Sequence, residues 1–451
     1  MVEKVSKLGV AIVGCGTVGG ATAKLLTHHA TTLRERLAVE LELRHIVDVD
    51  FANARAMNLN EKLFCDDLDK ALSDKSVSVV VELVGGTTFA RELIEKALNA
   101  GKHVVTANKA LLAHHGVELW ALARKRGVCI AFEASCAGGI PIIRALTDGL
   151  IANRIDALYG IVNGTCNYIL TAMTALGQSY GEALAAAQAG GLAEADPTLD
   201  VTGVDSAHKL AIMAALAFGR QVRFDAISTV GIDQLELCDI EYGQELGYVV
   251  KLLATAEREG PSAAGEGEGL CLTVRPAFIA TSHPLAWVGE SFNAVSVFGH
   301  ATGHTMYYGR GAGGMPTASA VVADIASVAT GTAMAMFTQL RVWPDLCEPA
   351  NQLPIEAVNS RYYLRATCED RPGVLAQLAD VLGRHDISIS SVLQHEPLPG
   401  EEEQGVPVII TTARAVEGDM RKALGEIDAL PVVKAATVCL PIVEEYPEPL
   451  E

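Results

Sequence analysis

The sequence predicts an α/β protein with three folded parts: an N-terminal parallel sheet, an α+β middle domain and a small C-terminal domain. Three observations support this prediction. A glycine-rich turn follows the first apolar run, and strands and helices alternate over residues 10–132. The C-terminal part has strands and helices in the order βαββαβ. The length of 451 residues exceeds what one hydrophobic core usually holds, so several domains are expected.

The N-terminal part reads as a Rossmann-like sheet. Gly14, Gly16 and Gly19 form the spacing GxGxxG directly after an apolar run, and a helix-compatible stretch follows. In that context the glycines allow a tight turn, close approach of a pyrophosphate and close packing of helix on strand, although an ordinary tight turn is the alternative. Further strands are expected at 43–47, 77–83, 103–106 and 128–132, with helices such as 89–100 and 116–126 between them.

The remaining chain changes character twice. Helices at 140–150, 168–176, 181–189 and 204–218 and strands at 157–162 and 270–276 predict an α+β domain, followed by one long helix over 317–336. Strands at 361–367, 387–394, 406–413 and 434–440, with helices at 371–384 and 418–427, give a ferredoxin-like order. The expected boundaries are 1–134, 135–310, a helix at 311–342 returning to the first domain, a linker at 343–360, 361–441 and an acidic tail at 442–451.

Composition excludes several classes of function. The net charge of −19 argues against nucleic acid and anionic membranes as partners. No apolar run is long enough to span a membrane, and the N-terminus lacks the pattern of a secretory signal. The ten cysteines are scattered without metal-ligand spacing, which favours free thiols. We therefore expect a cytoplasmic protein that acts on a small molecule.

Two polar clusters carry the expected chemistry. Thr106, Asn108 and Lys109 follow a parallel strand at its carboxyl end, where α/β sheets bind ligands. Asp205 and Lys209 are four residues apart on a helix that is apolar nearly all round. A solvated ion pair is the plain alternative, but burial of such a pair is unusual without a function. The intervening histidine, at position 208, is expected to pack or to position its neighbours.

These motifs together resemble homoserine dehydrogenases with a C-terminal ACT domain. The resemblance covers nearly the whole chain and rests on residues 14–19, 106–109, 163–165, 194–197 with 205–209, and 311–318. It implies reversible NAD(P)-dependent interconversion of L-homoserine and L-aspartate 4-semialdehyde, in threonine and methionine biosynthesis. It also implies that 135–310 is the catalytic and dimerisation domain and that 361–441 is a regulatory ACT domain whose natural ligand is threonine.

The resemblance assigns roles by matching position. Lys209 is the implied proton donor, and Asp205 orients it. Lys109, near the nicotinamide, is implied to support the same change of charge. The implied substrate contacts are Glu194, Asp205, Asp200, Gly164 and Thr165. The implied cofactor contacts are Gly14, Cys15, Gly16, Thr17, Val18, Gly19, Asp48, Gly85, Thr106, Asn108, Lys109, Gly191 and Gly313. A monovalent cation, sodium in the family, is implied at Glu133 with the backbone carbonyls of Cys136, Gly138 and Ile140.

One segment departs from the family. Val49, between Asp48 and Asp50, stands where many members carry the arginine that would meet a 2′-phosphate. Acidic residues there suit a ribose 2′-hydroxyl, which predicts a preference for NAD over NADP. Arg44 and Arg55 are the residues that could still reach a phosphate.

Other interpretations remain open at this stage. An aspartate-semialdehyde dehydrogenase would need a nucleophilic cysteine, for which Cys166 is the one candidate. A non-catalytic nucleotide and amino-acid sensor is the second alternative, and the intact Asp205 and Lys209 pair counts against it. The C-terminal domain could also be structural, without a ligand. A homodimer through the middle domain and a homotetramer through paired ACT domains are both compatible with the sequence.

Overall fold

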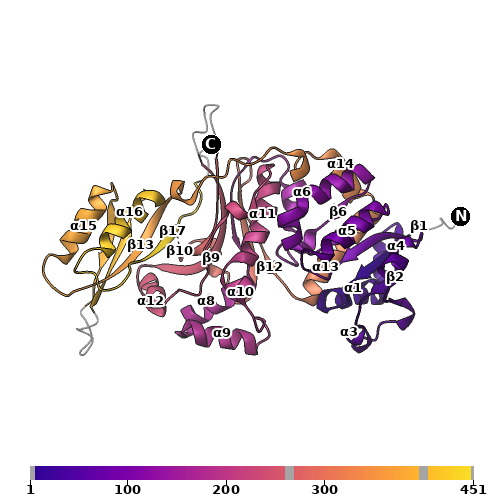
Figure 1. Cartoon of the computed structure of the whole chain (residues 1–451), viewed down its shortest axis with the longest axis horizontal. Helices are drawn as coiled ribbons and strands as arrows, with labels where there is room; N and C mark the ends of the chain where they lie inside the picture. The colour runs from indigo at the N-terminus through magenta and orange to yellow at the C-terminus, as the bar shows by residue number, and fades with distance from the viewer. Residues whose placement is uncertain (1–5, 260–268, 396–404, 448–451) are drawn as a thin grey trace. The chain divides into compact units, whose positions relative to one another are not determined.

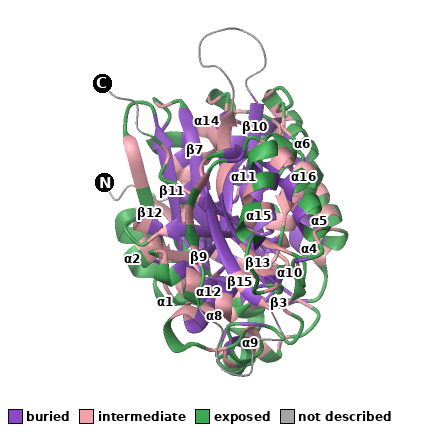
Figure 2. Cartoon of the chain, turned by 90° about the vertical axis from the view of Figure 1, so that its left-hand side faces the viewer, coloured by how far each residue is buried: buried purple, intermediate pink, exposed green. Residues whose placement is uncertain are grey.

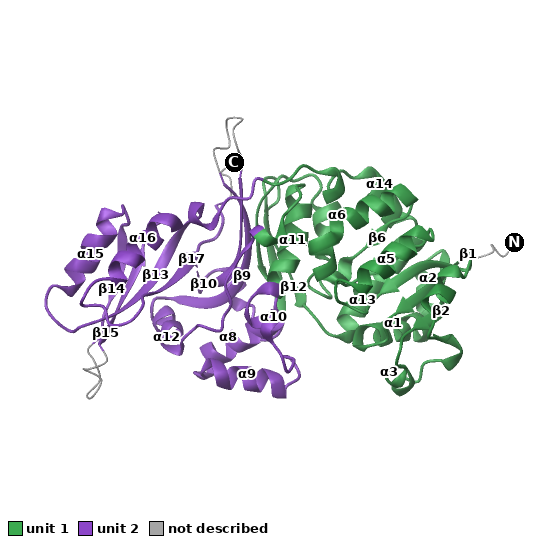
Figure 3. Cartoon of the chain, viewed as in Figure 1, with its two compact units in different colours: residues 1–162, 205–225, 292–350 green, residues 163–204, 226–291, 351–451 purple. Residues whose placement is uncertain are grey.

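The computed structural model describes residues 6–259, 269–395 and 405–447, and contacts divide the chain into two units (Figures 1 and 3). Unit 1 comprises residues 1–162, 205–225 and 292–350, and unit 2 comprises 163–204, 226–291 and 351–451. In these described ranges no single helix is long and apolar enough to cross a membrane. One bent pair, Gly314–Ala329 with Thr332–Leu346, passes by length and composition only.

A six-stranded parallel sheet forms the N-terminal part of unit 1, which confirms the predicted Rossmann-like fold. Its order is β3-β2-β1-β4-β5-β6. The strands are β1 (Ser6–Val13), β2 (Val39–Val47), β3 (Phe64–Cys65), β4 (Val77–Glu82), β5 (His103–Thr106) and β6 (Ile130–Ala131). The direction of winding reverses between β1 and β4, which creates a crevice at the carboxyl ends of these strands.

Helices surround this sheet, and most of them bury an apolar face, although α2 buries no residue; exposed residues line the outer side of helices such as α5 (Figure 2). They are α1 (Thr17–His28), α2 (Ala30–Arg36), α3 (Ala52–Ala56), α4 (Leu68–Ser73), α5 (Phe89–Asn99), α6 (Lys109–Arg126), α13 (Gly314–Ala329) and α14 (Thr332–Gln339). Helix α6 begins seven residues before its predicted start because Asn108 caps it. The predicted helix at 317–336 is broken at Gly331, whose φ of +80° suits glycine. Helix α13 packs against α1.

The rest of unit 1 contains an antiparallel run and the helix of the predicted ion pair. Strands β7 (Ile155–Ile161), β11 (Phe292–Gly299) and β12 (Gly303–Arg310) pair in the order β12-β11-β7. Helix α11 (Val204–Phe218) is buried almost throughout, as its composition predicts. The predicted helix at 140–150 is wrong in detail. It consists of α7 (Ile142–Arg144) and a π-helical turn (Ala145–Gly149), in which Leu150 N bonds Ala145 O five residues back.

Unit 2 begins with helices α8 (Gly164–Leu176), α9 (Tyr180–Ala189), α10 (Thr198–Val201) and α12 (Leu237–Glu245). Its strands include β8 (Ser228–Thr229), β9 (Tyr248–Glu259) and β10 (Gly269–Ala280). Strand β10 extends the predicted strand at 270–276, and its antiparallel partner β9 was not predicted. Nearly every residue in the centre of β9 is buried, including Lys251 and Thr255, and such a continuously buried run lacks the alternation that marks a half-exposed strand.

The C-terminal domain has the predicted ferredoxin-like order. Its elements are β13 (Asn359–Cys368), α15 (Val374–Arg384), β14 (Ile389–Leu393), β15 (Val406–Thr412), the short β16 (Ala415–Val416), α16 (Glu417–Asp428) and β17 (Val438–Val443). The sheet order is β17-β13-β15-β14. Parallel pairing of β17 with β10 joins this sheet to the β9–β10 hairpin. Residues 448–451 of the expected acidic tail lie outside the described residues.

Short 3₁₀ turns complete the described chain, at Glu61–Leu63, Glu133–Ser135, Phe224–Ala226, Pro284–Trp287, Pro344–Leu346 and Ile355–Ala357. The last two fall in the segment 343–360 that the sequence predicts to be a linker.

Candidate active site

The glycine-rich turn has the geometry that a pyrophosphate site requires. Gly14 has a φ of +93°, and a Cβ there would lie 2.7 Å from Leu83 O. A Cβ on Gly19 would overlap Gly14 O, so strand and helix approach closely only because both residues are glycine. Gly16 is exposed at the N-terminus of α1, and a Cβ at this position would have no atom within 4 Å. The free N–H groups of this helix end can therefore meet an anion.

Other predicted cofactor residues surround this turn. Asp48, just after β2, accepts the backbone N–H of Cys15 and also those of Val49 at 2.7 Å and Asp50 at 3.2 Å. Val49 is 98% exposed. The remaining ones in unit 1 are exposed Thr17, half-buried Val18, exposed Gly85 after β4, buried Thr106 and Asn108 after β5, and exposed Gly313 before α13. Gly191 is exposed and belongs to unit 2.

The predicted ion pair on α11 is buried and extends to a second lysine. Lys209 Nζ donates to Asp205 Oδ2 at 2.7 Å and to Val162 O at 2.6 Å. Lys209 and Asp205 are 8% and 7% exposed. Lys109, the first residue of α6, places its Nζ 3.1 Å from Asp205 Oδ1. One carboxylate thus bridges two ammonium groups that come from different helices.

This arrangement suits proton transfer beside a developing negative charge. Two ammonium groups share one carboxylate, so the cluster Lys109–Asp205–Lys209 carries an excess positive charge when both lysines are protonated. Such charge favours an alkoxide-like oxygen nearby. The Lys109 side chain is 38% exposed, whereas that of Lys209 is only 10% exposed.

His208 packs behind the cluster, as the sequence indicates. Its ring stacks on Phe224 at 4.6 Å between centroids and meets the His114 ring edge-on at 5.4 Å. Burial lowers the pKa of His208 to about 4, and His114 adds to the lowering. The ring is therefore neutral near pH 7 and acts as an apolar support for α11.

One predicted substrate residue of unit 2, Asp200, is held by Asn163, a residue that the sequence prediction did not assign to the site. Asn163 caps α8 by accepting Cys166 N at 2.8 Å, and its Nδ2 donates to Asp200 Oδ1 at 2.7 Å. Thr165 Oγ1 donates to the backbone carbonyl of residue 192 at 2.9 Å. The sequence feature that could have identified Asn163 is its position just before a helix that starts at Gly164, where asparagine commonly caps the helix.

Glu194 lies in the same unit 2 segment but differs from Asp200. It is exposed, and its carboxylate has no ion pair or hydrogen bond with the described residues. Glu194, Asp200, Gly164 and Thr165 belong to unit 2, whereas the lysine cluster belongs to unit 1.

The candidate cation site combines the Glu133 carboxylate with a turn that offers backbone oxygens. The Glu133 carboxylate accepts Ile143 N at 2.8 Å and Arg144 N at 3.0 Å, and it lies 3.6 Å from Arg144 Nε. Each oxygen of this carboxylate accepts one backbone N–H and keeps a second lone pair, which a cation could use. Ala137 and Gly138 both have left-handed φ values, +52° and +51°. The neutral carbonyl oxygens of this turn are chemically suitable for a hard monovalent cation.

Two further residues tie this turn into unit 1. The Cys136 thiol donates to Lys209 O at 3.8 Å, and burial raises its pKa to about 12. Asp324 on α13 accepts the backbone N–H of Glu133 at 2.8 Å. Burial raises the pKa of Asp324 to about 7, and Glu133 adds to the rise. The turn is thus connected both to α13 and to the backbone of the lysine cluster.

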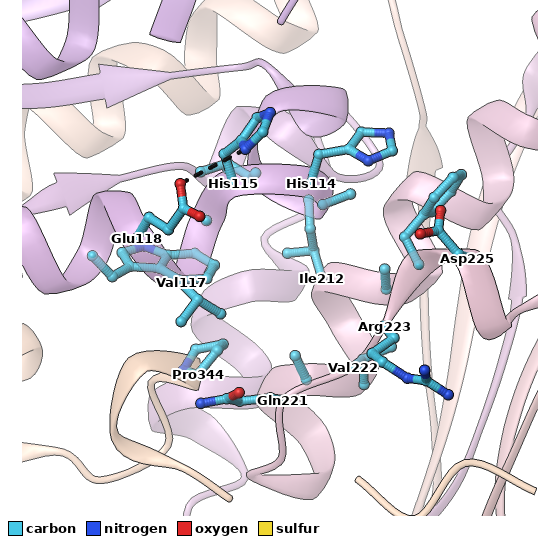
Figure 4. A pocket seen from close by; sticks show the side chains of 17 residues that line it. His114, His115, Val117, Glu118, Ile212, Gln221, Val222, Arg223, Asp225 and Pro344 are labelled. Carbon is cyan, nitrogen blue, oxygen red and sulfur yellow. Dashed lines mark ion pairs between the residues drawn. The ribbon is translucent and has the colours of Figure 1, made fainter. Parts of the chain in front are cut away.

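Three other features do not join the site. A cavity of about 370 Å³ lies beside α6 and α11, lined by His114, His115, Glu118, Ile212 and Asp225 among others, but not by the lysine cluster (Figure 4). Glu236, Cys238 and Asp239 lie close enough to hold an ion, yet Asp239 is bound by Arg365 and Tyr363. Cys166 is fully buried and its thiol donates to Asp200 O at 3.2 Å, so it presents no accessible nucleophile.

Comparison with known proteins gives one consistent result along the chain. A family model described as homoserine dehydrogenase matches residues 141–326, and its NAD-binding domain model matches 14–133. An ACT domain model matches 362–430. The homoserine dehydrogenases of Pseudomonas aeruginosa and Neisseria gonorrhoeae are 44% and 41% identical, over 95% of this chain and 97% and 96% of theirs.

Solved structures agree with this comparison. A homoserine dehydrogenase from Thiobacillus denitrificans superposes with a TM-score of 0.90 at 39% identity, covering 97% of this chain and 99% of the other. A hyperthermophilic archaeal homoserine dehydrogenase mutant in complex with NADPH gives a TM-score of 0.59 at 26% identity, over 72% of this chain and 98% of the other.

Proposed function

Because the chain belongs to the homoserine dehydrogenase family, whose members are oxidoreductases, we propose that Lys209 is its proton donor and that Lys109 supports the same charge change. The observation that carries this proposal is the bridging of both lysines by Asp205 at 2.7 and 3.1 Å. In the reductive direction the cofactor supplies a hydride to the aldehyde carbon of L-aspartate 4-semialdehyde. Lys209 then protonates the oxygen, which yields L-homoserine, and a neutral Lys209 takes that proton back in the oxidative direction.

The test is the aspartate-semialdehyde-dependent oxidation of NADH and NADPH by the wild type and Lys209→Ala. We expect kcat to fall about 10²- to 10⁴-fold, as is typical for loss of a general acid, with NADH still bound. Lys102→Ala is the matched control, because Lys102 is equally buried in unit 1 but bonds only the backbone carbonyls of Asp74 and Val77. A near-normal rate in Lys209→Ala would transfer the role to Lys109.

We also propose that Glu194 and Asp200 of unit 2 bind the substrate ammonium group. Gly164 and Thr165 of the same unit are proposed to contact the substrate as well. The support is chemical: Glu194 offers an exposed carboxylate, and Asn163 holds the carboxylate of Asp200 in place. Glu194→Gln is expected to raise KM for homoserine about tenfold or more with little change in KM for the cofactor. Equal effects on both KM values would contradict this assignment.

The cofactor preference is proposed to be NAD over NADP. Arg44 pairs with Glu42 at 2.9 Å, and Arg55 lies 3.8 Å from Glu61, so both candidate arginines already have acidic partners. The carboxylate of Asp48 beside the glycine turn repels a 2′-phosphate. The ratio of kcat/KM for the two cofactors tests this, and a larger value for NADP would refute it. The archaeal mutant enzyme described above was solved with NADPH, so a preference for NADP is the alternative that this ratio tests.

Regulation by threonine is proposed at the N-terminus of α15. Gly373, with a φ of +87°, is the N-cap that precedes this helix of eleven residues, where free N–H groups suit a ligand carboxylate. Millimolar threonine should lower the rate, and an unchanged rate would leave the ACT domain with a structural role. We also propose that a monovalent cation binds at residues 133–140, which is tested by measuring the rate after sodium is replaced with choline. We propose in addition that the protein is a homodimer or a homotetramer, which is tested by sedimentation.

A further inference from the structure

Glu82, the last residue of β4, is a fully buried carboxylate with three hydrogen-bond donors. Its Oε1 accepts the backbone N–H groups of Val84 and Gly85, each at 3.0 Å, and its Oε2 accepts Thr106 Oγ1 at 2.6 Å. No cation pairs with it in the part of the chain that the structure describes. A buried carboxylate without a counter-ion is costly, so its three neutral donors must compensate for lost water.

The bonds of Glu82 continue to the start of α6. Thr106 ends β5 and is paired in register with Glu82 on the neighbouring strand. Its hydroxyl oxygen accepts Asn108 N at 3.0 Å. Asn108 Nδ2 donates to Gly86 O at 2.7 Å, and Asn108 Oδ1 caps α6, which begins at Lys109. One carboxylate therefore connects the loop after β4 to the turn that carries a lysine of the proposed reacting centre.

We propose that Glu82 is a positioning residue for this reaction. It fixes loop 83–86 and turn 106–109 in one arrangement, and so places the cofactor-facing backbone and Lys109 together. Both segments follow strands at the carboxyl edge of the sheet, next to the reversal of strand order where this fold binds its cofactor. Gly85 and Gly86 have φ values of +75° and +74° and nothing within 4 Å of a Cβ, so this loop presents backbone. The inference rests on the proposed role of Lys109.

The role requires the carboxylate form of the side chain. The Thr106 hydroxyl already accepts Asn108 N–H, so its own proton needs an acceptor. A carboxamide has one oxygen and an NH₂ group. In Glu82→Gln the NH₂ group would therefore point either at the Thr106 hydroxyl or at the loop N–H groups, where an acceptor is needed. Glu82→Gln therefore breaks the connection while it preserves the size of the side chain.

The experiment compares Glu82→Gln, Thr106→Val, their double variant and Thr106→Ser in the full-length protein. We expect kcat to fall about 10- to 100-fold in each of Glu82→Gln and Thr106→Val, as for lost hydrogen bonds to a charged group. The NADH dissociation constant, measured by fluorescence titration without substrate, should rise about threefold or more in the same variants, because the loop after β4 is no longer held in place. Thr106→Ser keeps the hydroxyl and should remain within about threefold of wild type.

The double variant tests whether Glu82 acts through Thr106, since shared action predicts a loss no larger than that of the worse single variant. Glu417→Gln is the matched control. Glu417 is also a buried carboxylate that accepts a hydroxyl, that of Tyr362 at 2.9 Å, but it lies in the ACT domain and, unlike Glu82, pairs with a cation, Arg275 at 2.8 Å. This control should lower the melting temperature without changing kcat or NADH affinity.

Each outcome decides the proposal. Glu82→Gln with an altered melting temperature but unchanged kcat and NADH affinity would make Glu82 purely structural, and multiplicative losses in the double variant would separate it from Thr106. If Glu82→Gln fails to fold, the comparison of Thr106→Val with Thr106→Ser decides, because equal rates would overturn the role of the hydroxyl. A wild type that does not turn over, but whose NADH affinity still falls in Glu82→Gln, would contradict the proposed function and would leave Glu82 only the ordering of the loop after β4 for the cofactor.

Discussion

Asp205 and Asp239 occupy the same local position in two different regions and have different partners. Each is a buried aspartate in the first turn of a helix, α11 in unit 1 and α12 in unit 2. Asp205 bridges Lys209 and Lys109. Asp239 accepts the Arg365 guanidinium at 2.7 and 2.9 Å and the Tyr363 hydroxyl at 2.9 Å, and so holds α12 to the first strand of the ACT domain.

The difference lies in the cation rather than in the carboxylate. Lysine can release its proton within the working range of an enzyme, whereas arginine remains charged and binds a carboxylate through a rigid fork. The carboxylate on α11 is therefore suited to control a proton, and that on α12 is suited to fix two elements permanently. Burial alone does not distinguish the two functions, since both aspartates are less than one tenth exposed.

The largest expected effect comes from exchanging the type of cation at the proposed reacting centre. Lys209→Arg keeps the positive charge beside Asp205 but cannot donate a proton, so kcat should fall about 10²- to 10⁴-fold. Steady-state kinetics in both directions measure the change. Lys102→Arg is the control for inserting a guanidinium at a buried lysine of the same unit. A Lys209→Arg variant with more than a tenth of the wild-type kcat would show that charge, not proton transfer, is what this position contributes.

The corresponding change at the other aspartate should affect stability instead. Asp239→Asn leaves Arg365 with only Glu236, which is 3.1 Å away and 61% exposed, as an acidic partner. The loss should be about 3 kcal/mol of unfolding free energy, measured by urea denaturation. Asp380→Asn breaks an exposed pair with Arg384 on α15 and should cost less than about 0.5 kcal/mol. Similar losses in the two variants would contradict the structural role of Asp239.

These two aspartates also show what the sequence could and could not reveal. The Asp205 and Lys209 pair lies within one helix, so spacing and the apolar surroundings predicted it. The partners Asp239 and Arg365 are 126 residues apart, and no local pattern joins them. Glu82 was overlooked for a similar reason, because its partner Thr106 lies on a neighbouring strand 24 residues away.

The fold shows the same division between local and long-range information. The Rossmann-like sheet and the βαββαβ order were predicted because each strand is separated by turns or a helix with clear signals. Strands β9, β11 and β12 were missed. The buried runs of β9 and β11 have no period of two, and only the pairing partner distinguishes such a run from a helix. The start of α6 was also missed although its cap is local, since Asn108 Oδ1 accepts Leu111 N and Asn108 had been assigned to ligand binding only.

A smaller effect should follow from removing only the hydroxyl at the ACT contact. Tyr363→Phe deletes one hydrogen bond to Asp239 and leaves both bonds from Arg365 intact. Because the acceptor is charged, the expected loss is about 1.5 kcal/mol in the same urea experiment. Combined with Asp239→Asn, the second substitution should add much less than it does alone, since both act on one contact. Full additivity would mean that the Tyr363 hydroxyl contributes independently of Asp239.

A last expected effect appears only in acid and concerns how stability near the lysine cluster depends on pH. His208 has a lowered pKa, about 4, because of burial and His114, with Lys109 and Lys209 lowering it and Asp205 opposing them. The folded state thus binds this proton less readily than the unfolded state, where histidine titrates near about 6.5. Its contribution to stability is present above pH 6.5 and is lost as the pH falls toward 4.

His208→Phe should flatten the fall of the melting temperature between about pH 6.5 and 4, relative to the wild type. His395→Phe, at an exposed pair with Glu245, is the control. An equal slope in His208→Phe and wild type would show that folding does not lower the pKa of His208, and would contradict this prediction.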